Sequence, residues 1–130
     1  MSIIDHLSVG VPEIEAACKF YNPLLSAIGC NRLADSDGFA AYGKDRVEFL
    51  IILPFDKKAP TGGNGTHICF VAPTREAVDA FYQTALKYGG TDEGAPGPRE
   101  GYPIPDVYAA YLRDPFGNKL EVIYNGFANQ

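Results

Sequence analysis

The stretch His6-Leu7-Ser8-Val9-Gly10-Val11-Pro12 returns later in the chain as His67-Ile68-Cys69-Phe70-Val71-Ala72-Pro73. The two histidines are 61 positions apart. The same offset aligns further identical residues without a gap: Glu15 with Glu76, Ala16 with Ala77, Phe20 with Phe81, Tyr21 with Tyr82, Leu25 with Leu86 and Gly29 with Gly90. So many identities in one register indicate an internal repeat. It predicts two related modules, residues 1–58 and 66–130, joined by a linker at 59–65.

Each copy of the repeat predicts one strand, one helix and then three shorter strands. The first strands are expected at 4–11 and 67–71, and the proline after each strand suits a helix entrance. Helices are expected at 13–28 and 74–88, because apolar residues recur there every three or four positions. The remaining strands are expected at 30–34, 39–43 and 47–53, and then at 91–93, 107–113 and 119–124. The predicted fold class is therefore α+β, with two βαβββ modules.

One segment of the second copy has no counterpart in the first. Residues 94–105 are rich in proline and glycine and separate two of the expected strands. A loop that only one of two repeats carries is a candidate for a lid or a binding loop.

The bulk composition excludes several classes of function. The chain has 130 residues and a net charge of −5, so no basic surface is predicted for nucleic acid or an anionic membrane. The longest apolar run, residues 49–53, is too short to span a bilayer, and the N-terminal residues do not resemble a signal peptide. The three cysteines form no CxxC pair and are expected to be buried, reduced thiols. We therefore expect a cytoplasmic protein.

The only two histidines of the chain occupy equivalent places in the two copies. Side chains alternate between the two faces of a strand, so Leu7 and Val9 are expected to face the helix and His6 the opposite side. By the same alternation, His67 faces away from the second helix. Both imidazoles are thus predicted on the sheet faces that the helices leave open.

Two glutamates interrupt equivalent apolar strands, Glu48 in residues 47–53 and Glu121 in residues 120–124. Burying an ionised carboxylate costs on the order of several kcal/mol unless a partner compensates it. An exposed edge strand, or a salt bridge to Arg32, Arg46 or Lys119, would also explain them. We favour a divalent metal, because two imidazoles and two carboxylates suit zinc, nickel, cobalt, manganese or iron(II). No organic cofactor is indicated, and Glu48 or Glu121 could serve as a general base.

Several motifs resemble one known family over nearly the whole chain. They are Asp5-His6-Leu7, Phe20-Tyr21, Gly65-Thr66-His67-Ile68 and Arg113-Asp114-Pro115-Phe116-Gly117-Asn118-Lys119-Leu120-Glu121. The chain resembles the vicinal oxygen chelate superfamily, which includes glyoxalases, bleomycin resistance proteins and extradiol dioxygenases. The resemblance implies curled mixed sheets that form a cup around one metal. It also implies the ligand set of glyoxalase I, which falls on His6, Glu48, His67 and Glu121.

The resemblance further implies a metal-dependent lyase or isomerase of glyoxalase type, which chelates a small oxygenated substrate, with or without a conjugated thiol. Two alternatives stay open: a non-catalytic dimer that binds a drug or metabolite, as bleomycin resistance proteins do, and a related enzyme such as a dioxygenase or an epimerase. Glyoxalase I carries basic residues near its first strand that hold glutathione, whereas this chain has Ser8 and Gly10 there.

The expected partner is a small molecule. Candidate residues for its pocket are Phe39, Tyr42, Arg99, Tyr102 and Tyr108, with Tyr111 nearby in the same strand as Tyr108. Small members of the superfamily usually form dimers, so the resemblance implies a homodimer. The linker leaves open whether the modules pair within one chain or are swapped between two subunits.

Overall fold

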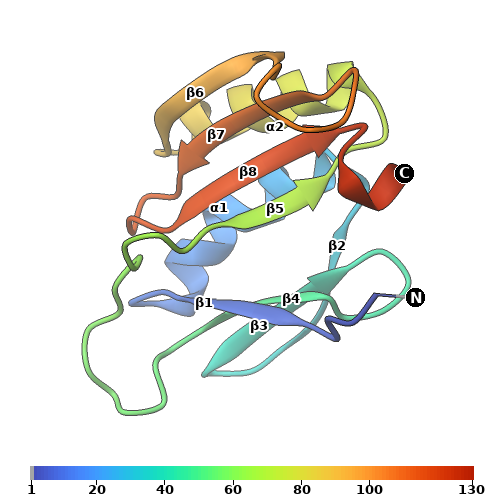
Figure 1. Ribbon diagram of the computed structural model, residues 1–130. Helices are drawn as coiled ribbons and strands as arrows, with labels where there is room; N and C mark the ends of the chain where they lie inside the picture. The colour runs from blue at the N-terminus through green and yellow to red at the C-terminus, as the bar shows by residue number, and fades with distance from the viewer. Residues whose placement is uncertain (1) are drawn as a thin grey trace.

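The computed structural model describes residues 2–130, which form two four-stranded sheets and two helices (Figure 1). The first copy of the repeat contains β1 (Leu7–Gly10), α1 (Ile14–Ser26), β2 (Asn31–Asp35), β3 (Phe39–Gly43) and β4 (Phe49–Ile52). The second contains β5 (Ile68–Val71), α2 (Arg75–Lys87), β6 (Thr91–Pro98), β7 (Tyr108–Arg113) and β8 (Lys119–Tyr124). A short 3-10 helix, Phe127–Asn129, follows. The α+β class is confirmed.

The two sheets have the same topology, as the internal repeat requires. The strand order is β1-β4-β3-β2 in one sheet and β5-β8-β7-β6 in the other. In each sheet the first strand pairs in parallel with the last strand of its module, and the other pairs are antiparallel. The sheets are therefore mixed, and β1 and β5 each end a sheet with one unpaired edge.

The apolar sides of the two modules meet in one continuous core. Helix α1 packs against α2 and against β2, β3 and β4, while α2 packs against β6, β7 and β8. Figure 1 shows both helices behind the strands of the second sheet, with the first sheet below it. Phe49 of β4 and Phe70 of β5 meet edge to face, with ring centroids 5.0 Å apart. No helix within residues 2–130 is long and apolar enough to cross a membrane.

The turn between β7 and β8 ties the second module to the first. The carboxylate of Asp114 accepts hydrogen bonds from the backbone amides of Phe116 and Asn118, which fixes the turn. The amide of Asn118 donates a 3.0 Å hydrogen bond to the carbonyl oxygen of Gly10 in β1. The most specific family motif of the chain therefore holds the two modules together.

The strands differ from their predicted limits in one informative place. Strand β6 runs to Pro98, although residues 94–105 were expected to form a loop. Two register shifts, between Asp92 and Gly94 and between Gly94 and Gly97, let this segment keep its pairing with β7. Gly94 has a φ of +154°, a conformation that glycine adopts readily, so the bulged strand tolerates it. Only the second half of the expected loop is irregular.

Candidate functional site

His67 and Glu121 form a pair on the open face of the second sheet. Cys69 of β5 lies opposite Glu121 of β8, and His67 lies two residues before Cys69 on the same face. The Nε2 atom of His67 is 3.1 Å from Oε1 of Glu121. The carboxylate is 1% exposed and the imidazole 43% exposed. The sequence prediction that Glu121 is buried opposite an imidazole is therefore correct.

Tyrosine hydroxyls complete the surroundings of Glu121. The hydroxyl of Tyr102 donates a 2.5 Å hydrogen bond to Oε2 of Glu121 and lies 3.2 Å from the hydroxyl of Tyr111. Desolvation and the hydrogen bond to Glu121 raise the pKa of Tyr102 far above its usual value, so this hydroxyl keeps its proton. Desolvation also raises the pKa of Tyr111.

These contacts correct one step of the sequence argument. Glu121 was expected to need a cation, because a buried carboxylate without a partner is costly. Instead His67 and Tyr102 occupy its two oxygens, and no buried side-chain nitrogen or oxygen within residues 2–130 lacks a hydrogen-bond partner. The burial of Glu121 is thus compensated within the chain, and metal binding has to be argued from the chemistry of the donor atoms.

Cys69 was expected to be buried, but it is exposed on the edge strand β5. Although the residue as a whole is exposed, atoms packed around its sulfur desolvate the thiol, and this desolvation and the neighbouring Glu121 carboxylate raise its pKa. A neutral thiol is a weak nucleophile and a weak metal ligand. Of the other two cysteines, Cys18 is buried as predicted and Cys30 is partly exposed.

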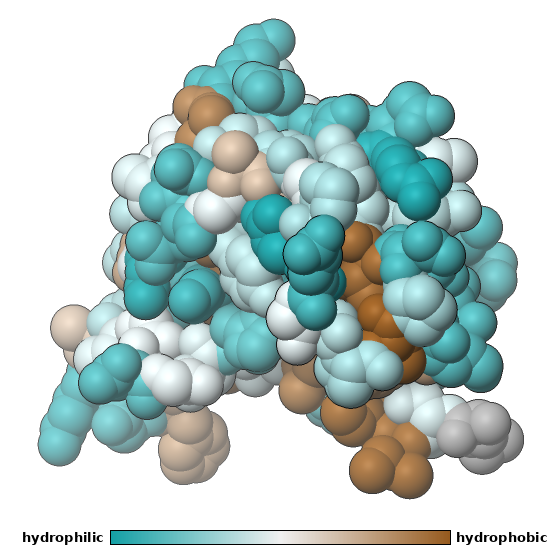
Figure 2. All heavy atoms as spheres, turned by 45° about the horizontal axis from the view of Figure 1, so that its top comes forward, coloured by the Kyte–Doolittle hydropathy of each residue, from teal (hydrophilic) through white to brown (hydrophobic). Residues whose placement is uncertain are grey.

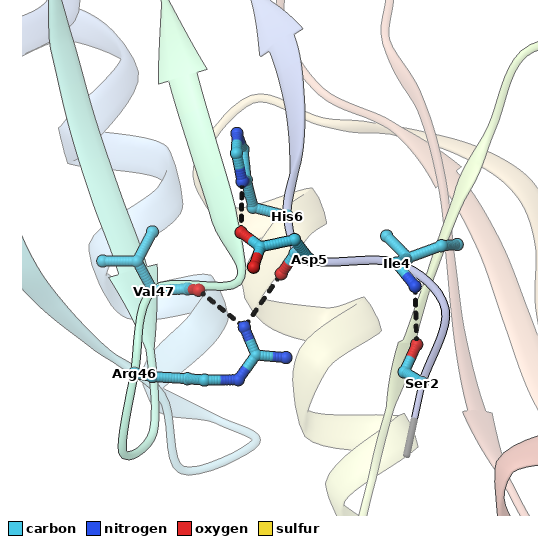
Figure 3. A network of polar contacts seen from close by, with 6 residues as sticks. All are labelled: Ser2, Ile4, Asp5, His6, Arg46 and Val47. Atoms are coloured by element: carbon cyan, nitrogen blue, oxygen red, sulfur yellow. Dashed lines mark hydrogen bonds and ion pairs between the residues drawn. The ribbon is translucent and has the colours of Figure 1, made fainter.

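His6 lies in a separate polar network at the start of β1 (Figure 3). Its Nδ1 atom is 2.7 Å from Oδ1 of Asp5, and the imidazole is 57% exposed. The guanidinium of Arg46 donates hydrogen bonds to the carbonyl oxygens of Asp5 (2.9 Å) and Val47 (3.2 Å). The hydrogen bond from His6 lowers the pKa of Asp5 below its usual value. Asp5 and Arg46 therefore hold the segment that carries His6.

Glu48 does not lie in the environment that the sequence indicated. It was expected inside a strand buried on both faces, but it is exposed and directly precedes β4. Its backbone continues the ladder, because Glu48 donates to the carbonyl of Tyr42 and accepts from the amide of Leu7. The open face of β4 is only partly covered, so a carboxylate there remains hydrated. The desolvation argument consequently applies to Glu121 and not to Glu48.

The four predicted metal ligands do not converge within one chain. No group of three or more histidine, cysteine, aspartate or glutamate side chains within residues 2–130 could hold a metal ion. The structure brings His67 and Glu121 together, while His6 and Glu48 directly precede β1 and β4 of the other sheet. Each module thus carries half of the predicted ligand set, and the assignment of all four residues to one metal stays a prediction.

A cleft of about 540 Å³ lies between the two modules. Both unpaired edges line it, since its walls include Leu7 of β1 and Ile68, Cys69, Phe70 and Val71 of β5. Asp5, Arg46 and Glu48 also reach this cleft. The two sheets therefore do not close around a common site.

The candidate pocket residues fall into two groups. Tyr42 is 1% exposed and donates a hydrogen bond to Asn22, while Tyr108 donates to Asp79 of α2, so both face the helix sides of their sheets. Phe39 is partly exposed at the start of β3. Arg99 and Tyr102 share a hollow of about 440 Å³ with Tyr111 and Phe127, next to Glu121. The sequence analysis missed Phe127, because no pattern in the chain relates it to the loop that carries Arg99 and Tyr102.

This combination of fold and residues agrees with the comparisons. The sequence model of the glyoxalase/bleomycin resistance protein/dioxygenase superfamily matches residues 3–122. The chain belongs to this superfamily.

Solved structures agree. A glyoxalase/bleomycin resistance protein from Albidiferax ferrireducens T118 is 34% identical, with a TM-score of 0.87 over 96% of this chain and 100% of that one. A glyoxalase-related enzyme from Fulvimarina pelagi is 14% identical, with a TM-score of 0.73 over 96% and 89%. A protein named lactoylglutathione lyase from Agrobacterium tumefaciens is 20% identical, with a TM-score of 0.66 over 96% and 95%. The last two support the fold alone.

Proposed function

We propose that the protein is a metal-dependent lyase or isomerase of glyoxalase type that acts on a small oxygenated substrate. The observation that carries this proposal is the pair formed by His67 Nε2 and Glu121 Oε1, 3.1 Å apart on the open face of the second sheet. An imidazole nitrogen and a carboxylate oxygen at this separation are placed to ligate one ion of the zinc, nickel or iron(II) type. Membership of the superfamily supports the same chemistry.

The donor set of the chain fits such an ion when both modules contribute. His67 and Glu121 supply two ligands, and His6 and Glu48 supply two more of the same kinds. When bound, the metal would polarise substrate oxygens and stabilise negative charge on them. No thiolate is needed, which agrees with the raised pKa of Cys69.

The two glutamates differ in what they are free to do. The side chain of Glu121 is 1% exposed and lies beside His67, so it has little room to move, which suits a fixed ligand. Glu48 is exposed and lines the cleft, so its carboxylate is free to take a proton from a substrate carbon. We therefore assign Glu48 two roles, as the more exposed ligand and as the general base, and keep Glu121 as a ligand alone.

The complete site requires a second copy of the chain. The contacts between Asn118 and Gly10 and between the helices hold the two modules of one chain in an arrangement that keeps the ligand pairs apart. The unpaired edges of β1 and β5 line an open cleft. We propose a homodimer in which His6 and Glu48 of one copy meet His67 and Glu121 of the other.

Exposed apolar side chains support this dimer. Ile3 and Phe55 are fully exposed, and Ile4, Leu7 and Val71 are exposed around the two sheet edges. Figure 2 shows apolar side chains in a strip between hydrophilic ones and again along the lower edge of the face in view. Apolar surface of this kind favours association with another protein surface.

Metal content is the direct test of the proposed function. Protein purified without chelator should hold about one divalent ion per chain, because a symmetric dimer has two sites. The Glu121→Gln variant should lower the occupancy at least about tenfold, since one ligand loses its charge. Glu13→Gln, an exposed position at the start of α1, is the matched control and should leave it unchanged. Wild-type protein that takes up no metal on titration would contradict the proposal.

The alternative is a non-catalytic dimer that binds a drug or metabolite in the same clefts. The observation that favours it is the compensation of Glu121 by His67 and Tyr102, which makes the carboxylate stable without a metal. Ligand binding that is identical with and without added zinc or nickel would support this alternative and exclude the lyase.

A further inference from the structure

The hollow beside Glu121 contains a cation that no acidic side chain neutralises. The ion pairs of residues 2–130 include Arg32 and Arg113 but neither Arg99 nor Lys119. Arg113 lies on the same face of β7 as Tyr111, and its Nε atom is 3.0 Å from the carboxylate of Glu93. This arginine therefore has an acidic partner, which Arg99 lacks among the described residues. Arg99 is only partly exposed, so solvent screens its charge incompletely.

Backbone carbonyl groups fix the guanidinium of Arg99. Its Nη2 atom donates to the carbonyl oxygens of Gly94 and Ala95, and Nη1 donates to that of Pro98. A guanidinium has five N–H donors, so these contacts leave donors free for a ligand. The carbonyl groups orient the guanidinium without cancelling its charge, so the guanidinium is preorganised to bind an anion.

Two positive groups lie near the ring of Tyr111. The guanidinium carbon of Arg99 is 5.7 Å from the ring centroid and Nζ of Lys119 is 5.5 Å from it. Arg99 lines the hollow directly, whereas Lys119 contributes through the local potential. The rings of Tyr102 and Phe127, with centroids 5.6 Å apart, provide an apolar wall.

We propose that this hollow binds the carboxylate of a small aromatic or apolar monoanion, with Arg99 as its anchor. The claim that this anion is the substrate rests on the proposed function, whereas the claim that the hollow binds it does not. Tyr102 joins the hollow to the Glu121 carboxylate, so a molecule anchored at Arg99 would extend toward the candidate metal ligands. A single anchoring guanidinium favours a molecule with one carboxylate over a conjugate with two.

Binding of benzoate to metal-free, chelator-treated protein tests this inference without any need for activity. Titration at constant ionic strength, followed by two-dimensional NMR, should move the signals of Arg99, Tyr102, Tyr111 and Phe127. Benzamide, which has the same shape without the charge, should bind at least about tenfold more weakly, the loss expected for one charge-assisted hydrogen bond.

Variants then distinguish direct anchoring by Arg99 from the general positive potential of nearby lysines. Arg99→Gln should weaken benzoate binding at least about tenfold. Arg99→Lys should restore only part of it, because the charge returns without the fixed planar donors. Lys119→Gln should have an effect of less than about threefold, as expected for an unanchored charge. Lys87→Gln, an exposed control on α2, should have none.

Equal affinities for benzoate and benzamide, or an Arg99→Gln variant that binds benzoate like the wild type, would overturn the inference. Either result would leave the metal content of the protein, and so the proposed function, untouched. Conversely, wild-type protein that takes up no metal but binds benzoate through Arg99 would contradict the proposed metal-dependent enzyme and support the anion site.

Discussion

The hydroxyl of Tyr21 in α1 donates a 2.5 Å hydrogen bond to Oδ2 of Asp114, 93 positions later in the chain. Both residues are buried, at 0% and 2% exposed. Because the donor belongs to the first module and the acceptor to the second, this bond sets how the two modules lie within one chain. It also bears on the site, since the same turn leads into β8, which carries Glu121.

Removing this hydroxyl should destabilise the whole chain. In Tyr21→Phe the buried Asp114 keeps its bonds from Asn118 and the backbone but loses one donor. We expect the free energy of unfolding to fall by about 1.5–3 kcal/mol, the usual contribution of a hydrogen bond to a charged group. Urea unfolding measures this change. Tyr124→Phe, whose hydroxyl makes no hydrogen bond within residues 2–130, is the control; equal stability of the two variants would show that the bond contributes nothing.

The same tyrosine should make the protein sensitive to alkali. Desolvation, and then the Asp114 carboxylate, raise the pKa of Tyr21 well above 10, while the unfolded chain ionises near that value. The folded state therefore binds more protons above about pH 10, and its stability falls as the pH rises. Urea unfolding at pH 8 and pH 10.5 should show this fall in the wild type and a smaller one in Tyr21→Phe. A fall of the same size in both proteins would assign it to other groups.

Tyr102 should compete with a metal for Glu121. In Tyr102→Phe one oxygen of the buried carboxylate loses its donor, so the metal-free protein should lose about 1–3 kcal/mol of stability. Added zinc can then satisfy that oxygen and should stabilise the variant more than the wild type. Urea unfolding with and without zinc measures both effects, with Tyr88→Phe on the surface as control. If zinc stabilised the two proteins equally, Tyr102 and the metal would not share Glu121.

Mixing two variants that each lack metal binding should restore it if the ligand set is shared between copies. One chain carries His6→Ala and Glu48→Gln, and the other His67→Ala and Glu121→Gln. A heterodimer of the two has one intact site out of two, so its metal content should reach about half of the wild-type value. Purification of the mixed species with two different tags, followed by elemental analysis, makes this measurable.

The two homodimers are the internal controls of that experiment and should hold no metal at this site. If all four ligands belonged to one chain, the heterodimer would be as empty as its parents. Recovery therefore distinguishes sharing between subunits from pairing within a chain.

The repeat explains why so much of the fold was predictable. Two copies in one register fixed the order of helices and strands, and the limits 39–43 and 119–124 agree with β3 and β8. Local chemistry decides these elements, because the period of the apolar residues selects helix or strand. Strand β6 was predicted too short, since pairing with β7 across two bulges is a tertiary interaction that overrides its glycines and prolines.

The sequence by itself determined the order of elements in the two βαβββ modules, the open-face position of His67 and the burial of the Glu121 carboxylate. Alternation along a strand and register between copies are local rules, so they survive without knowledge of packing. Only the tertiary structure decided that Tyr102 compensates Glu121, that Glu48 is exposed and that the two ligand pairs stay apart. Those outcomes depend on contacts between distant segments, such as Tyr21 with Asp114, and no local pattern encodes them.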